Sequence, residues 1–104
     1  MKISVVFITI DKKNSADKIA KILLNKRLCA CVNIIKNVES HYWWKGKKEK
    51  AKEYLLVIKT KKNLVDKLIN ETKKVHPYTV PEIIAFDVEK GNFDYINWVI
   101  KETI

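Results

Sequence analysis

The segment from His76 to Ile83 concentrates residues that could do chemistry in one short stretch. It contains both prolines of the sequence, and each proline restricts φ and removes a backbone N–H donor. The resulting stiff connector presents an imidazole, a phenol and a carboxylate at His76, Tyr78 and Glu82. A rigid loop that displays such side chains is a common place for a site. His76 and Glu82 could also act as an acid–base pair, but no third group with a defined role accompanies them.

Side chains of the kind that bind soft or borderline metals are few. Cys29 and Cys31 are the only cysteines, and His41 and His76 are the only histidines. Thiolates suit Cu(I), and imidazoles suit copper and zinc. The spacings match no zinc motif, because neither C-x-x-C nor H-E-x-x-H occurs. Taken one at a time, these residues are better explained by packing or helix capping than by metal binding.

The chain is strongly basic, with a formal net charge of +9 from 21 basic and 12 acidic residues. Such a surplus can attract an anionic partner. Lysine is a solvated point charge, however, and arginine, preferred for reading phosphates and bases, occurs only at Arg27. The strand expected from Glu53 to Thr60 lacks the stacking aromatic residues of RNA-binding sheets. With only two glycines, no phosphate-loop motif can be written. We therefore expect no nucleic-acid partner.

The length of 104 residues predicts one domain that covers residues 1–104. The longest apolar runs, such as residues 5–8, are too short to cross a bilayer. No charged start leads into an apolar segment and a cleavage site, so no secretory signal is expected. We expect no membrane association and a cytoplasmic location, where the cysteines stay reduced.

Periodicity predicts a strand followed by a helix in the first third of the chain. Apolar and β-branched residues from Ile3 to Ile10 indicate a buried strand. Asn14 or Ser15 is expected to cap the helix that follows. Its buried stripe has i, i+3, i+4 spacing and comprises Ala16, Ile19, Ala20, Leu23 and Leu24.

The remaining elements complete a recognisable order. From Ala30 onward the side chains are expected to alternate between two faces, which indicates a first long strand. A turn is expected at residues 45–48, and a second long strand over residues 49–60. A second helix is expected from about Asn63, then the proline segment, a strand over 82–88 and a terminal helix over 93–103. The order β-α-β-β-α-β predicts an α+β, ferredoxin-like subunit with two helices on one face of an antiparallel sheet, plus a C-terminal helix.

The two central strands are longer than the ~5–6 residues that are usual for a strand. If the first strand of this hairpin is unbroken, Val32, Tyr42 and Trp44 lie on one of its faces. Cys31 and His41 then lie on the other face. The outer end of this hairpin carries a large aromatic cluster, Tyr42, Trp43 and Trp44. Such a cluster is too large to leave in water, so we expect the hairpin to project and to contact another copy of the chain. A closed homo-oligomer follows. A hairpin folded back on its own core is the alternative.

Taken together, the motifs resemble the CutA family of divalent-cation-tolerance proteins. The resemblance covers essentially the whole chain, in order and at family spacing. The matching residues are Leu28 with Ala30-Cys31-Val32-Asn33-Ile34, Ser40 with Tyr42-Trp43-Trp44 and Gly46, Glu53 with Ile58-Lys59-Thr60, His76-Pro77-Tyr78, Pro81-Glu82-Ile83, and Gly91 with Tyr95 and Trp98.

The resemblance implies a cytoplasmic, non-enzymatic homotrimer that acts in tolerance of copper or other divalent metals. Tyr42, Trp43 and Trp44 would then lie at the trimer interface. His76 and Cys31 are the candidate metal ligands. The remaining candidates would line a cleft between subunits, and they are Tyr78, Glu82, Asn33 and Lys59.

This chain departs from the family where copper binding is concerned. Copper binding in some members involves a cysteine late in the first strand and a histidine pair at the end of the second helix. Ile8 and Val75 stand at those positions here, so only His76 remains. The family trimer also resembles that of PII signalling proteins. A second hypothesis is therefore a regulatory trimer that binds a small anionic ligand in the cleft.

Overall fold

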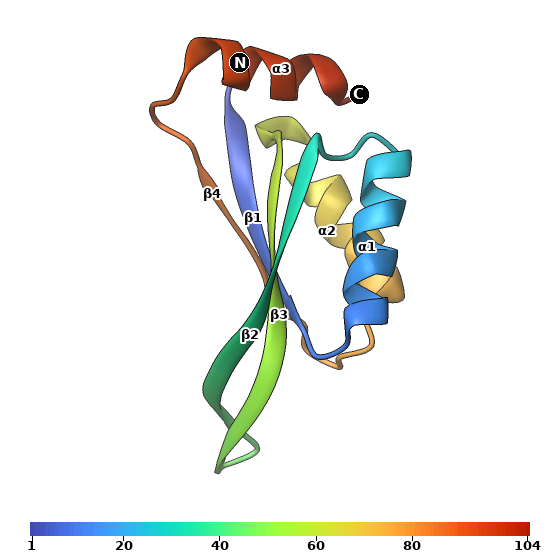
Figure 1. Ribbon diagram of the computed structural model, residues 1–104, viewed down its shortest axis with the longest axis vertical. Helices are drawn as coiled ribbons and strands as arrows, with labels where there is room; N and C mark the ends of the chain where they lie inside the picture. The colour runs from blue at the N-terminus through green and yellow to red at the C-terminus, as the bar shows by residue number, and fades with distance from the viewer.

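The computed structural model describes all of residues 1–104. Its elements confirm the predicted α+β order with a terminal helix (Figure 1). They are β1 (Ile3–Ile10), α1 (Lys13–Asn25), β2 (Cys31–Trp44), β3 (Lys47–Lys61), a 3-10 turn (Lys62–Leu64), α2 (Val65–Val75), β4 (Ile83–Asp87) and α3 (Phe93–Glu102). No helix is both long enough and apolar enough to span a membrane.

The four strands form one antiparallel sheet in the order β2-β3-β1-β4. Helices α1 and α2 lie on one face of this sheet, and α3 crosses its end near the start of β1 (Figure 1). Alternate side chains of β1 and β3 point toward the helices and are buried with the apolar stripes of α1 and α2. This core includes Val6, Ile8, Ile10, Ile19, Leu23, Leu56, Ile58 and Leu68.

Helix α1 differs from the expectation at both of its ends. It begins at Lys13, directly after Lys12, and no side chain caps it, so the predicted cap at Asn14 or Ser15 is wrong. The connection from β1 leaves only residues 11–12 before the helix, and both expected cap residues are already in its first turn. Leu24, expected in the buried stripe, is 41% exposed because the stripe that faces the sheet is narrower than the pattern indicated.

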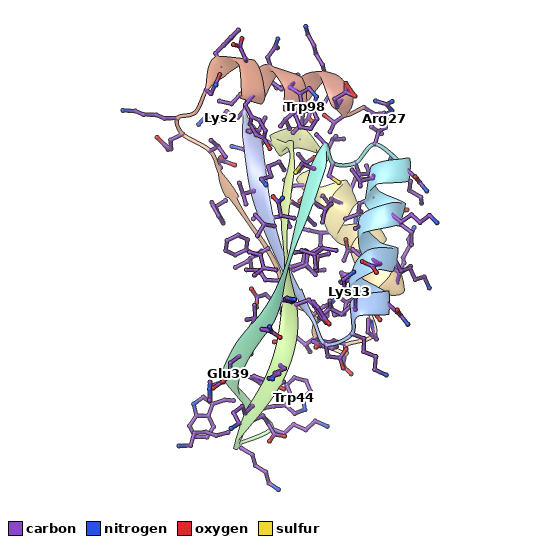
Figure 2. The ribbon with its side chains drawn as sticks, in the orientation of Figure 1. Lys2, Lys13, Arg27, Glu39, Trp44 and Trp98 are labelled. Atoms are coloured by element: carbon purple, nitrogen blue, oxygen red, sulfur yellow. The ribbon has the colours of Figure 1, made fainter.

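The hairpin of β2 and β3 extends beyond the rest of the sheet. β1 pairs with β3 only as far as Tyr54, whereas β2 and β3 stay paired out to Trp44 and Lys47. Figure 2 shows Trp44 and Glu39 on this projecting part, which we call the arm (residues 38–53). Its turn needs only Lys45 and Gly46, with left-handed φ values of 51° and 79°. Two such residues match the twist of the flanking strands.

An irregularity in β2 changes the face on which each arm side chain lies. Ile35 pairs with Leu55 and Val38 pairs with Glu53, so β2 advances by one residue more than β3. Asn37 has a left-handed φ of 62° at this bulge. Because strand side chains alternate, the extra residue moves every later side chain of β2 to the opposite face.

The predicted alternation along β2 is therefore wrong beyond the bulge. Tyr42 and Trp44 do not share a face with Val32, which packs against the core on the helix side. They lie on the face that carries Cys31, and His41 lies on the other. The prediction assumed an unbroken strand, and one inserted residue is sufficient to reverse it.

The sheet face away from α1 and α2 is apolar and has little cover. Phe7 and Phe86 meet edge to face there, with ring centroids 5.2 Å apart. Ile35, Ile84 and Phe86 are 48%, 53% and 48% exposed. Beyond the bulge, the same face continues along the arm through Tyr42. We call this surface the open sheet face, and a patch of this kind is unusual on a monomer.

Asn37 tests the role of the bulge. A β-branched residue resists a left-handed φ, so Asn37→Val should lower the free energy of unfolding by about 1–3 kcal/mol. Asn37→Gly removes that strain and should preserve the stability. Urea denaturation measures both changes. Glu39→Val, in ordinary extended backbone on the same strand, is the control, and equal losses at the two sites would contradict a special role for the bulge.

Glu71 of α2 provides a pH-dependent contact with α1. It accepts hydrogen bonds from Lys26 and, at 2.6 Å, from Lys74. These bonds lower the pKa of Glu71 from 4.5 to about 2, and the bond from Lys26 has the larger effect. Because folding lowers the pKa of this carboxyl group, its ionised form stabilises the folded state at pH values above the ordinary pKa. This stabilisation is lost as the pH falls through the pKa that the group has in the folded state.

We therefore expect Glu71→Gln to destabilise the protein most near neutral pH. The difference from the wild type should shrink from about pH 4.5 downward and vanish only below about pH 2. Urea denaturation at a series of pH values measures this difference. Glu89→Gln, which removes a carboxylate that makes no ion pair, is the control. A difference that does not change with pH would contradict the assignment.

Candidate functional site

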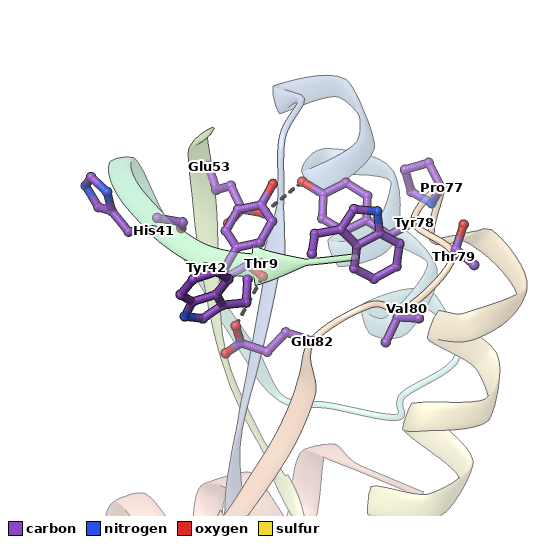
Figure 3. A pocket seen from close by; sticks show the side chains of 12 residues that line it. Thr9, His41, Tyr42, Glu53, Pro77, Tyr78, Thr79, Val80 and Glu82 are labelled. Atoms are coloured by element: carbon purple, nitrogen blue, oxygen red, sulfur yellow. Dashed lines mark hydrogen bonds between the residues drawn. The ribbon is translucent and has the colours of Figure 1, made fainter. Parts of the chain in front are cut away.

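A cavity of about 770 Å³ lies where the arm, the end of β1 and the proline segment meet. Figure 3 shows its lining, and we call this cavity the arm pocket. Its carboxylates are Glu53 from β3 and Glu82 from the proline segment. Its aromatic side chains are Tyr42, Trp43, Trp44 and Tyr78. The pocket is built from segments that are far apart in the sequence.

His76 anchors the proline segment to β1. Its Nε2 lies 2.9 Å from the backbone oxygen of Thr9, and its Nδ1 lies 3.1 Å from the backbone nitrogen of Tyr78. The carbonyl can only accept and the amide can only donate, so the geometry requires a neutral ring with its proton on Nε2. His76 is only 8% exposed and does not line the arm pocket.

Tyr78 connects the proline segment to the arm. Its hydroxyl donates a hydrogen bond of 2.7 Å to Oε2 of Glu53 (Figure 3). Burial raises the pKa of Tyr78 well above its ordinary value, and the carboxylate of Glu53 adds a smaller increase. The phenol therefore stays protonated and serves as a hydrogen-bond donor. Glu53 is 8% exposed, although it lies on the sheet face that the helices leave open.

Glu82 lies just before β4 and points toward Thr9 (Figure 3). Its Oε1 accepts a hydrogen bond of 3.3 Å from the hydroxyl of Thr9. Glu53 and Glu82 form no ion pair within the chain. The arm pocket is thus a negatively charged site in a basic protein.

The other predicted site residues form a separate cluster at the start of β2. Lys59 donates hydrogen bonds to Asn33 and, at 3.8 Å, to the sulfur of Cys31. Burial, and to a smaller extent Cys31, raises the pKa of Tyr95 on α3. We call these side chains the Cys31 cluster.

The Cys31 cluster and the arm pocket are distinct places. Cys31 pairs with Lys59, whereas Thr9 at the pocket pairs with Leu55. Four residues of β3 separate these positions, which is about 13 Å of strand. The structure therefore brings Tyr78 and Glu82 together and places Asn33 and Lys59 elsewhere, so the four cleft candidates do not line one pocket of the chain.

The aromatic residues of the arm divide between its two faces. Tyr42 and Trp44 belong to the open sheet face, and Trp43, opposite Lys48, belongs to the other. Trp43 is 70% exposed. His41 borders the arm pocket, but its exposed ring turns away from it toward Glu39, at 2.8 Å (Figure 3).

The two candidate metal ligands do not converge. No group of three or more His, Cys, Asp or Glu side chains could hold a metal within the chain. His76 would have to give up one of its hydrogen bonds to ligate a metal, and Cys31 sits beside the ammonium group of Lys59. The assignment of these two residues to a metal stays a prediction.

Glu53 and Thr9 are pocket residues that the sequence argument did not select. Glu53 is a carboxylate at the edge of an apolar strand, which is the signal that could have drawn attention to it. Thr9 gave no such signal, because threonine is an ordinary strand residue. Its contacts with His76 and Glu82 depend on the tertiary structure.

Comparison with known proteins agrees with the resemblance seen in the sequence. The family model described as "CutA1 divalent ion tolerance protein" matches residues 4–102. Protein CutA of Homo sapiens is 46% identical over 97% of this chain, but only 56% of that protein is covered. The chain thus spans about half the length of this relative. The divalent-cation tolerance protein CutA of Pyrococcus horikoshii is 42% identical over 95% of this chain and 96% of its own length.

Solved structures give the same result for the fold. The divalent cation tolerance protein from Thermus thermophilus superposes with a TM-score of 0.94 at 42% identity, covering 97% of this chain and 98% of that one. CutA1 from Oryza sativa superposes with a TM-score of 0.96 at 38% identity, covering 100% of this chain and 95% of that one. The chain therefore belongs to the CutA1 divalent ion tolerance protein family.

Proposed function

We propose that this protein acts as a non-enzymatic homotrimer in the tolerance of divalent cations. The observation that carries the proposal is the family match over residues 4–102, whose description names divalent ion tolerance. Relatives from Pyrococcus horikoshii and Thermus thermophilus carry the name divalent-cation tolerance protein. The chain covers 96% of each of these relatives.

The open sheet face supports self-association. Its half-exposed apolar residues, among them Ile84 and Phe86, would be removed from water by a second copy of the chain. Burial of such a surface is the usual source of stability in an obligate oligomer. A contact between identical chains closes into a symmetric assembly, and the resemblance to the CutA family sets the expected number at three.

The arm supports the same proposal through its backbone. Residues 47–53 of β3 have β2 on one side and no strand on the other, because β1 pairs no further than Tyr54. Unpaired strand edges readily accept a strand from another chain. An exchange of arms between copies would pair this edge and bring Tyr42 and Trp44 against a neighbouring subunit.

The metal chemistry of a single chain is incomplete. The arm pocket offers oxygen atoms of two carboxylates, and the Cys31 cluster offers one thiol. Neither place supplies the three protein ligands of a typical zinc site. We infer that copper or another divalent ion binds weakly, or that a second subunit completes the ligand set.

A regulatory trimer that binds a small anion is the second candidate. Lys59 in the Cys31 cluster provides a cationic group on the open sheet face. The carboxylates of the arm pocket argue against an anion at that place. The expected cytoplasmic location stays a prediction, since the rice relative is named as chloroplastic and a structure from Archaeoglobus fulgidus as periplasmic.

Light scattering tests the assembly. The wild type should have about three times the chain mass of 12.2 kDa. Phe86→Lys places a charge on the open sheet face and should shift the protein toward monomers. Phe93→Lys makes the same change at an exposed position on α3 and should leave the mass unaltered. A monomeric wild type, or equal effects of both changes, would contradict the proposal.

Calorimetric titration with Cu²⁺ and Zn²⁺ tests the metal assignment. His76→Ala should lower the free energy of unfolding by about 1–3 kcal/mol, because two buried backbone groups lose their partner. The heat of metal binding should change little. His41→Ala, at an exposed histidine, controls for the loss of an imidazole. A loss of binding heat in His76→Ala alone would contradict this expectation and favour His76 as a ligand.

A further inference from the structure

The arm pocket has a charge opposite to that of the protein around it. The chain carries 21 lysine and arginine residues, yet none of them lines this cavity. Glu53 and Glu82 do line it, and Asp11 is close enough to raise the pKa of Tyr78 as well. A cavity that excludes every lysine and arginine of such a protein is suited to a positively charged ligand.

Glu53 has no counter-ion within the chain. The residue is only 8% exposed, and its one side-chain hydrogen bond comes from the neutral hydroxyl of Tyr78. The second oxygen of Glu53 makes no hydrogen bond within the chain and is still reached by solvent, because no buried side-chain oxygen of the chain lacks a partner. A cation bound in the pocket could therefore pair with this oxygen directly.

Aromatic rings form the other walls of the pocket. Tyr78 meets the carboxylate of Glu53 through its hydroxyl (Figure 3), and Tyr42 and Trp44 line the same cavity. Aromatic faces attract cations, and quaternary ammonium groups are often held in cages of this kind. Trp44 already has such a contact, because the ammonium of Lys45 lies 5.8 Å from its ring centroid.

The size of the cavity favours an organic cation over a bare metal ion. A volume of about 770 Å³ is in the range of small-molecule pockets. A metal ion needs several oxygen ligands at short distances, whereas these two carboxylates are tied to hydroxyls on different elements. We propose that the arm pocket binds a small organic ammonium ion, with Glu53 and Glu82 as counter-charges and Tyr42 and Trp44 as aromatic walls.

Calorimetry with choline on the assembled protein tests this proposal, which goes beyond the role in divalent-cation tolerance. Choline should bind at least ~10-fold more tightly than the neutral alcohol in which a tert-butyl group replaces its trimethylammonium group. Glu82→Gln, at an exposed position, should weaken choline binding by about 10-fold, and Glu53→Gln should act in the same direction. The tryptophan fluorescence of the arm gives a second readout.

Glu39→Gln is the matched control, because it removes a carboxylate from the arm outside the pocket. Equal affinities for choline and the alcohol, or equal effects of Glu39→Gln and Glu82→Gln, would overturn the proposal. Tyr42 and Trp44 are also expected to approach a second subunit. If that subunit fills the pocket, choline will not bind, and this outcome too would overturn the proposal.

A parallel titration with Zn²⁺ separates this inference from the proposed function. Zinc binding that depends on Glu82, with no binding of choline, would overturn the ammonium site and leave the role in cation tolerance standing. Choline binding that depends on Glu82, with no binding of any divalent ion, would support the ammonium site and count against metal binding alone.

Discussion

The pairing of β2 with β3 sets the length of the sheet and the position of the arm. It runs from the core of the sheet to the tip of the arm, well past the last residue of β1. The bulge before Val38 then decides which side chains continue the open sheet face and which point away from it. One inserted residue thus aligns Tyr42 and Trp44 with the apolar surface and turns Trp43 toward the opposite side.

The proline segment is a structural joint with a chemical consequence. His76 uses both ring nitrogens to hold this segment against β1, so the most conspicuous candidate for chemistry is an anchor. The anchor in turn places Tyr78 and Glu82 at the arm pocket. The rigidity of the two prolines matters because it presents these side chains at a fixed distance from Glu53.

Charge is distributed unevenly between the surface and the pocket. Lysines cover the exposed faces of the helices and the arm, where water solvates them. The arm pocket retains two carboxylates without any of these cations. A protein that is basic overall can therefore offer a local site for a cation, and the net charge of +9 says little about which ligand that site prefers.

The sequence was sufficient to predict the order of elements and the family, because hydrophobic periods and ordered motifs depend only on local spacing. It placed β1 at its observed bounds and predicted a projecting hairpin from strand length. It could not determine the face of Tyr42, since a bulge has no reliable local signal, nor the role of His76, whose partner Thr9 is 67 residues away. Both points depend on which distant strands and segments meet, so they became visible only in the folded chain.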